Sequence, residues 1–361
     1  GDRGASLLVK MSGKSRRWCD ETVVSASREP MHAPLHCWET AAQALGCPLT
    51  LRPPTSRWVM RLTPAEWAFS LVEHAHEAPR LPDGAARARG FDAADWSAIR
   101  VPCSWETAGF GRPIYTNTVY PFPVDPPNVP AEGNAVGTYQ TSFSLPGAWA
   151  GRRTLLRFDG VDGAVTVWLN GREVGYSQDG KLPFEFDVTD ACAAGEADRH
   201  TLSVQVVRFS DASYLEDQDQ WWLSGIHRDV AVYSKPRAAA IADFYATTSL
   251  VEGGGGDGGS GGGDGGSGGG EREEAGTAAS AIRSATVAVR VGLRGAVFAA
   301  EGKAAGGTTA DSATAAEACR RYEIAASLHG PYRLAPDAPP PGCGCVWRGA
   351  VSLDGALPVG A

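Results

Sequence analysis

The sequence has no long apolar run and no excess of positive charge. No stretch approaches the roughly 20 consecutive apolar residues that a membrane-spanning helix needs, and the start, GDRGASLLVKMSGK, lacks the apolar centre of a signal peptide. The formal net charge of −8 would repel nucleic-acid phosphates and anionic membranes. We therefore expect a neutral ligand, no nucleic-acid partner, no membrane association and a cytoplasmic location.

The cysteines also lack a recognisable pattern. No two of them form a CxxC pair, and the nearest two, Cys343 and Cys345, have no histidine beside them. A structural zinc site needs thiolate and imidazole ligands at fixed spacings. We expect mostly unpaired thiols and no zinc site.

One segment, 253–270, has almost no side chains and reads GGGGDGGSGGGDGGSGGG. Such a composition cannot form a core and gives a flexible coil. A phosphate-binding loop would need a preceding strand, a following helix and usually a lysine. We predict a glycine-rich insert over 252–275.

Alternating apolar and polar residues recur through much of the first 240 positions. This period of two is typical of strands with one buried face, and it covers 139–143, 165–169, 202–206 and 230–233. Asn170-Gly171 follows 165–169 and supplies the two positive-φ residues of a type I′ hairpin turn. Many short strands at this spacing predict an all-β fold, a jelly-roll β-sandwich.

Alternation resumes after the glycine tract, at 287–293 and 322–328. We therefore divide the chain into an N-terminal segment with the jelly roll, 1–240, and a second, interrupted and incomplete all-β domain, 241–361. Residues 1–100 are less regular, although the apolar side chains around Trp67 indicate a strand and 78–92 reads as a surface loop.

The stretch 208–230, RFSDASYLEDQDQWWLSGIHRDV, concentrates acidic and aromatic residues without helical or strand periodicity. Carboxylates accept hydroxyl protons, and flat indole rings cover the apolar face of a sugar. We interpret the stretch as a long functional loop that would bring acids and indoles to a sugar, namely Asp211, Glu216, Asp217, Asp219, Trp221 and Trp222. The alternative, with tryptophans in the core and acids capping turns, fits the composition equally well.

A second candidate is Asn117, in IYTN. It precedes a proline-rich loop at 120–130, YPFPVDPPNVP, whose fixed φ angles stiffen the chain. An amide both donates and accepts hydrogen bonds, so Asn117 suits a ligand hydroxyl. A structural asparagine in a turn is the alternative.

Two other arrangements are rejected. Glu216 and Asp219 lie three residues apart on one segment, whereas the carboxylate pair of a glycosidase usually comes from separate elements that fix its spacing. His74 and His76 lie in a divergent surface stretch with no third metal ligand nearby. We predict neither a catalytic pair nor a metal site there.

Three long runs together resemble one family. They are VPCSWETAGFGRPIYTNTVYPFPVDPPNVP from Val101, FDGVDGAVTVWLNGREVGYSQDGKLPFEFDVT from Phe158 and RFSDASYLEDQDQWWLSGIHRDVAVYSKP from Arg208. In this order they resemble the sugar-binding jelly roll of the large β-galactosidases of glycoside hydrolase family 2. The resemblance implies a galactose-binding-like jelly-roll sandwich followed by a partial immunoglobulin-like sandwich.

By resemblance, Asn117 and Asp219 complete the galactose subsite. Asp219 would ligate an active-site sodium ion and meet the galactose 6-hydroxyl, while Asn117 would bond a hydroxyl near the reacting carbon. A hard ion held by an oxygen ligand can orient such a hydroxyl. The resemblance therefore implies a β-galactoside as substrate and sodium as a cofactor.

The resemblance also implies a magnesium site. Gln178 and Asp211 match two of its ligands, and Asp20 and the carbonyl of Val23 would complete it from the N-terminal segment. Arg17 stands where an acid is expected, and Asp20 stands where an amide is expected. A cation in place of an anionic ligand should weaken a divalent site.

The family's catalytic glutamates lie on a (β/α)8 barrel, one after an Asn and the other between a Cys and a Tyr. None of the four asparagines here precedes a Glu, and no Cys-Glu-Tyr occurs. We expect a truncated piece of a retaining β-galactosidase that hydrolyses lactose-type substrates. It should be inactive alone and homo-oligomeric at full length. A stand-alone carbohydrate-binding module and a purely structural β-sandwich are the alternatives.

Overall fold

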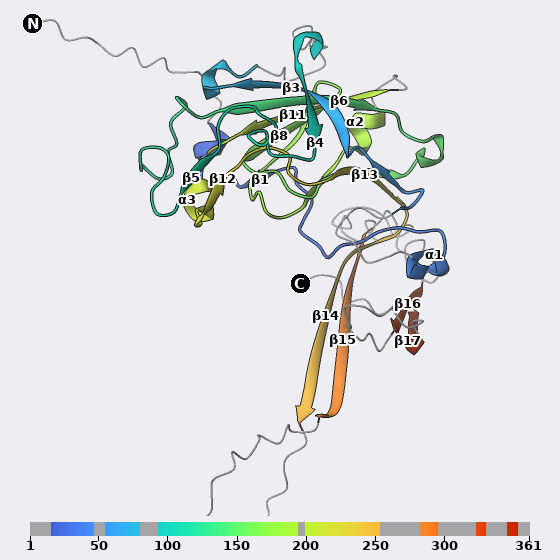
Figure 1. Cartoon of the computed structure of the whole chain (residues 1–361). Coiled ribbons are helices and arrows are strands. Elements are labelled where there is room, and N and C mark those ends of the chain that lie inside the picture. Colours follow the sequence, from blue (N-terminus) through green and yellow to red (C-terminus); the bar gives the residue numbers. More distant parts are fainter. Residues whose placement is uncertain are drawn as a thin grey trace, which may run out of the picture. The chain divides into compact units, whose positions relative to one another are not determined.

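The computed structural model describes residues 16–46, 55–79, 93–193, 199–252, 282–294, 323–329 and 345–352 (Figure 1). The chain divides into two compact units, one of Gly1–Met31 with His36–Ala238 and the other of His32–Leu35 with Ala239–Ala361. Within the described ranges, no helix is long and apolar enough to cross a membrane.

The first unit consists mainly of two antiparallel sheets. The larger has the order β1 (Ser25–Ala26), β9 (Arg172–Ser177), β8 (Ala164–Leu169), β11 (His200–Val207), β6 (Val136–Phe143), β3 (Ala65–Val72) and β4 (Ser97–Val101). The smaller has the order β10 (Phe184–Asp187), β7 (Arg153–Phe158), β13 (Val230–Lys235) and β2 (Val59–Arg61). This arrangement confirms the predicted all-β fold of the jelly-roll type.

The helical elements are short. The α-helices are α1 (Ala41–Gly46), α2 (Thr189–Ala193) and α3 (Ser213–Glu216), and the 3-10 turns are η1 (Arg17–Cys19), η2 (Ala75–Glu77), η3 (Ala93–Asp95) and η4 (Gly147–Trp149). A further two-stranded ladder joins β5 (Ile114–Thr116) to β12 (Gln220–Trp222).

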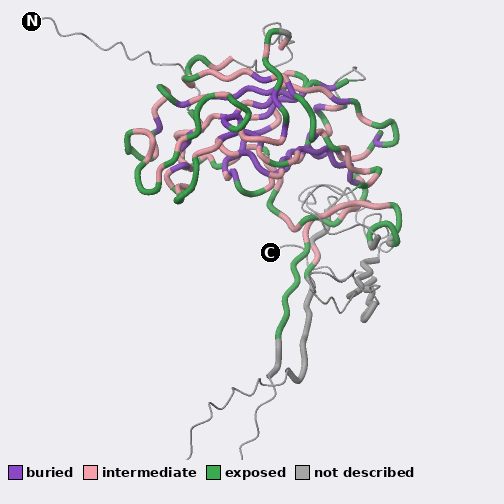
Figure 2. Tube along the Cα trace, viewed as in Figure 1, coloured by how far each residue is buried: buried purple, intermediate pink, exposed green. Residues whose placement is uncertain are grey.

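The alternating apolar residues of both sheets form one core. Leu202, Val204 and Val206 of β11 and Val230 and Val232 of β13 are fully buried in it. Because successive strand side chains point to opposite faces, period-two alternation presents one apolar face per strand. The buried segments in Figure 2 accordingly gather between the sheets.

The Asn170-Gly171 turn joins β8 to β9 as predicted. Asn170 has a φ of 54° and Gly171 a φ of 78°, the left-handed values that a type I′ turn requires. The Asn170 side chain also accepts the Thr201 N–H at 3.0 Å. The turn is therefore fixed to β11 as well as to its own strands.

The second unit consists of antiparallel strand pairs in its described part. β14 (Ala240–Glu252) pairs with β15 (Ile282–Arg294), and β16 (Glu323–His329) pairs with β17 (Cys345–Ser352). The alternation at 287–293 lies within β15, and that at 322–328 largely coincides with β16. The glycine-rich insert lies outside the described residues beyond its first position, as does most of the 78–92 stretch.

Gly175 of β9 marks a close approach between the sheets. A Cβ at this position would lie 2.1 Å from Phe186 Cε1 of β10 and 2.9 Å from the Ala26 carbonyl oxygen. Contacts this short force neighbouring atoms to move. The facing sheets therefore need glycine at this point.

We predict that Gly175→Ala lowers the free energy of unfolding by about 1–3 kcal/mol, because an overpacked core must shift. Urea unfolding measures the loss. Gly147→Ala is the matched control, since a Cβ at Gly147 would meet no atom within 4 Å. Equal stability of the two variants would contradict the packing argument.

Candidate functional site

The β5–β12 ladder lies outside the two main sheets and carries the predicted sugar contacts. Tyr115 stands opposite Trp221 in its register. The Trp222 indole N–H donates to Thr116 Oγ1 across the ladder at 2.5 Å. In Figure 1 the two strands run side by side, with α3 near them. The stretch 208–230 thus contains a helical turn and a short strand rather than one continuous loop.

The ladder brings Asn117 and Asp219 to the same end. Asn117 directly follows β5, and Asp219 directly precedes β12, one step beyond the pair Thr116 and Gln220. Continuing the antiparallel register sets Asn117 and Asp219 opposite each other. The two residues that the sequence nominated separately therefore share one end of a ladder.

The Asp219 carboxylate is oriented by a neighbouring side chain. The Tyr115 hydroxyl donates a hydrogen bond to Asp219 Oδ1, and this bond is the main cause that raises the pKa of Tyr115. An ionised carboxylate has two oxygens and about four acceptor positions. Asp219 can thus be held by Tyr115 and still accept a ligand hydroxyl or contact a hard cation.

Two aromatic rings beside Asp219 face solvent. The exposed fractions are 52% for Tyr115 and 56% for Trp221, and their ring centroids lie 5.5 Å apart. Trp222 is half-buried and packs edge-on against Phe209 at 5.5 Å. The alternative that placed the tryptophans in the core is therefore wrong for Trp221, and Tyr115 is a site residue that sequence reasoning missed.

The proline-rich loop at 120–130 is fastened to α3. The Tyr120 hydroxyl donates to the Tyr214 carbonyl at 2.9 Å, and the Tyr214 hydroxyl donates to the Asn128 carbonyl at 2.7 Å. Phe122 also packs on Phe209 with centroids 5.0 Å apart. These contacts join the chain after Asn117 to the chain before Asp219.

The second predicted group, Gln178 and Asp211, lines a cavity of about 610 Å³. Gln178 Nε2 donates to Asp211 Oδ1 at 2.7 Å and to the Tyr176 hydroxyl at 2.8 Å. Glu21 lines the same cavity, as do Asp179 and Glu216. The structure therefore brings the two predicted ligands into contact.

Arg17 and Asp20 of the N-terminal segment have partners within the described chain. Arg17 pairs with Glu173 of β9 at 2.5 Å. The Asp20 carboxylate accepts the Thr22 N–H at 3.1 Å, and the Asp20 carbonyl accepts the Val23 N–H at 2.8 Å. Asp20 is thus engaged in a local turn.

Acidic side chains lie near Asp211. Burial raises the pKa of Asp211, and the nearby Glu21 and Asp20 raise it further. Oxygen donors of this kind suit a hard divalent cation. Among the described residues, however, no three His, Cys, Asp or Glu side chains are placed so that they could share a metal ion. The donor chemistry fits magnesium, and Glu21 supplies an acid that sequence reasoning missed.

Glu216 and Asp219 have different surroundings. Glu216 lines the acidic cavity, where burial is the main cause that raises its pKa. Asp219 bonds to Tyr115 on the ladder. The two carboxylates therefore face different groups, one in the acidic cavity and one on the ladder.

His74 and His76 have an acid beside them that sequence spacing could not reveal. Their Nδ1 atoms lie 3.0 and 3.4 Å from the Glu132 carboxylate, whose side chain is 74% exposed. His74 Nδ1 also lies 2.9 Å from the Gly133 N–H, which donates to it. The Glu132 carboxylate is thus exposed, and His74 Nδ1 already accepts a backbone hydrogen bond.

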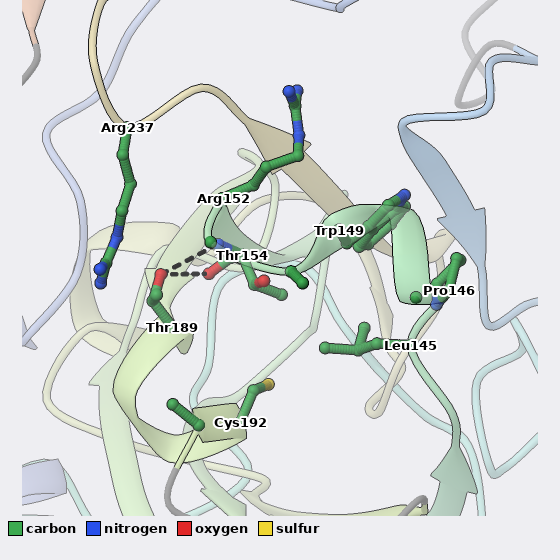
Figure 3. A pocket seen from close by; sticks show the side chains of 12 residues that line it. Leu145, Pro146, Trp149, Arg152, Thr154, Thr189, Cys192 and Arg237 are labelled. Carbon is green, nitrogen blue, oxygen red and sulfur yellow. Dashed lines mark hydrogen bonds between the residues drawn. The ribbon is translucent and has the colours of Figure 1, made fainter.

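A second cavity, of about 320 Å³, is lined by none of the predicted site residues (Figure 3). Leu145, Pro146 and Trp149 form apolar walls, and Thr189 accepts the Thr154 N–H at 2.9 Å.

The four described cysteines whose side chains can be assessed, Cys19, Cys37, Cys103 and Cys192, are unpaired thiols as predicted.

Curated proteins of other organisms are similar to this chain in sequence. β-Galactosidase of Psychromonas ingrahamii is 41% identical over 237 residues, which are 66% of this chain and 21% of that protein. β-Galactosidase of Vibrio vulnificus is 46% identical over 185 residues, 51% of this chain and 17% of that protein. The chain thus spans about a fifth of the length of these curated relatives.

Solved structures of two β-glucuronidases are also similar. That of Bifidobacterium dentium, in complex with coumarin-3-O-glucuronide, is 23% identical with a TM-score of 0.36, over 54% of this chain and 32% of that one. That of Bacteroides uniformis is 21% identical with a TM-score of 0.40, over 54% and 20%.

The family match coincides with the sandwich and its ladder. Residues 60–236 match the description "Glycosyl hydrolases family 2, sugar binding domain". This range contains β5, which Asn117 follows, and β12, which Asp219 precedes. It also contains Gln178 and Asp211. Over residues 60–236, the sandwich with its ladder is therefore similar to the sugar binding domain of glycosyl hydrolases family 2.

Proposed function

We propose that this chain supplies galactose contacts to a β-galactosidase, and that the groups that cleave the glycosidic bond lie outside these 361 residues. The names of the relatives and the sugar-binding description of 60–236 support the proposal. The substrates would be terminal β-D-galactosides such as lactose.

One observation carries the proposal: Asn117 and Asp219 lie at the same end of the ladder, beside two exposed rings. Asp219 would accept the galactose 6-hydroxyl and hold a sodium ion with its remaining oxygen. Asn117 would bond a hydroxyl near the reacting carbon. Tyr115 and Trp221 would offer apolar surface to the C–H face of the sugar.

We predict that the chain binds methyl β-D-galactoside weakly, with a Kd on the order of millimolar, in ligand-detected NMR. Asn117→Ala and Asp219→Asn should each weaken binding about tenfold, because each loses a hydrogen bond to the sugar. For Asp219→Asn, exchanging sodium for choline in the buffer should no longer change the affinity.

Asp190→Asn is the control for these variants, since the Asp190 side chain is 87% exposed on α2, away from the ladder. Unchanged affinity of both ladder variants would refute the proposed subsite. Equal binding of methyl β-D-glucoside would refute its preference for galactose.

We predict no hydrolysis by the chain alone. Retaining hydrolysis needs an acid and a nucleophile about 5–5.5 Å apart on opposite sides of the bond, and the sequence has no Asn-Glu and no Cys-Glu-Tyr. Incubation with a nitrophenyl β-D-galactoside should release no nitrophenol above the blank. Turnover that Asp219→Ala abolishes would show that this chain carries the reaction itself.

We also propose magnesium for the acidic cavity, with Asp211, Gln178 and Glu21 as its oxygen donors. About 10 mM magnesium should then stabilise the fold by about 1–3 kcal/mol, since a ligand that binds only the folded state adds its binding free energy. Thermal unfolding measures this gain. Asp211→Asn and Glu21→Gln should reduce it, whereas Glu132→Gln, on an exposed loop, should keep it. An equal gain in Asp211→Asn would rule out this site.

A further inference from the structure

A buried ion pair lies at the base of the ladder. Arg208 Nη2 is 3.3 Å from Glu106 Oε1, and the exposed fractions of the two side chains are 8% and 0%. Glu106 belongs to the segment after β4, and Arg208 directly follows β11. The pair therefore joins two segments of the sandwich at the point where the ladder begins.

Both charged groups also bond to backbone at the ladder. Arg208 Nη2 donates to the Trp222 carbonyl at 3.0 Å and to the Arg112 carbonyl at 3.2 Å. Glu106 Oε2 accepts the Ser224 N–H at 2.9 Å. Arg112 comes two residues before β5, Trp222 ends β12, and Ser224 comes two residues after it. The ion pair thus contacts the chain next to β5 and the chain at the end of β12.

These contacts fall at the end of the ladder opposite Asn117 and Asp219. Ile114 pairs with Trp222 at the ion-pair end, and Thr116 pairs with Gln220 at the other end. A two-stranded ladder is marginally stable by itself, and within the part of the chain that the structure describes no third strand pairs with β5 or β12. Its orientation therefore depends on contacts with the rest of the sandwich, and the ion pair supplies those at its base.

Burying these two charges costs free energy, which indicates that the pair does more than stabilise the fold. Burial raises the pKa of Glu106 and lowers the pKa of Arg208, so each charged form is disfavoured. Apolar side chains of similar size are often at least as stable as a buried ion pair. They could not, however, satisfy the carbonyls of Arg112 and Trp222 or the Ser224 N–H.

We propose that Glu106 and Arg208 are positioning residues that set the orientation of the β5–β12 ladder and, through it, of Asn117 and Asp219. This inference rests on the proposed function for its consequence in sugar binding. The clamp, meaning the Glu106–Arg208 pair with its three backbone partners, acts through the ladder and does not contact the sugar.

The test follows the Trp222 indole N–H, because its bond to Thr116 Oγ1 crosses the ladder. We measure its hydrogen exchange by NMR in the full 361-residue chain, together with the affinity for methyl β-D-galactoside and the unfolding temperature. Arg208→Lys keeps the charge and loses the planar fork that serves two carbonyls. It should speed indole exchange about tenfold and weaken galactoside binding about tenfold.

The double variant Glu106→Gln with Arg208→Met removes both charges together, so no unpaired ion is left in the core. It should also speed indole exchange and weaken binding while it retains the cooperative unfolding of the sandwich. This variant keeps the test decisive if Arg208→Lys fails to fold.

Glu185→Gln is the matched control, because Glu185 pairs with Arg157 at 3.1 Å with side chains 6% and 12% exposed, between β10 and β7. It should lower the unfolding temperature and leave both the indole exchange and the affinity unchanged. Clamp variants with wild-type exchange and affinity would overturn the inference. No galactoside binding by the unsubstituted chain would instead refute the proposed function.

Discussion

The apolar faces of the two sheets can leave water only by packing against each other, and this burial holds the rest of the first unit in place. Trp67, Phe158 and Phe186 are almost completely buried in the core that the two sheets share. Where the sheets approach most closely, even a methyl group does not fit at Gly175. The loops at the sandwich edge therefore start from rigid, well-defined strand ends.

The proposed sugar-binding surface is held in place by a different kind of interaction. β5 and β12 contribute few buried apolar side chains, and hydrogen bonds, exposed rings and one buried ion pair orient them. Polar contacts of this kind depend strongly on direction, whereas apolar burial is nearly indifferent to it. The fold thus separates the interactions that give stability from those that orient the ligand-facing groups.

Much of the sandwich could be predicted because its signals are local. Asn170-Gly171 specifies a turn by its φ angles, and the alternation of β11 specifies its buried face. β12 and α3 escaped prediction because three or four residues show no period. Asn117 and Asp219 could be nominated from residue type and resemblance, whereas Glu21 in the acidic cavity and Glu132 beside His74 reach their positions only through tertiary contacts.

The contacts of the ladder join distant parts of the chain. Tyr115 and Asp219 are 104 positions apart, and Glu106 and Ser224 are 118 apart. During synthesis Asn117 leaves the ribosome long before Asp219, and contacts with such separation form late because a long loop must close first. The proposed sugar-binding end therefore exists only once these distant parts of the chain have come together. Galactose recognition would then report on completed folding, and fraying of β12 alone would abolish it while the core stayed intact.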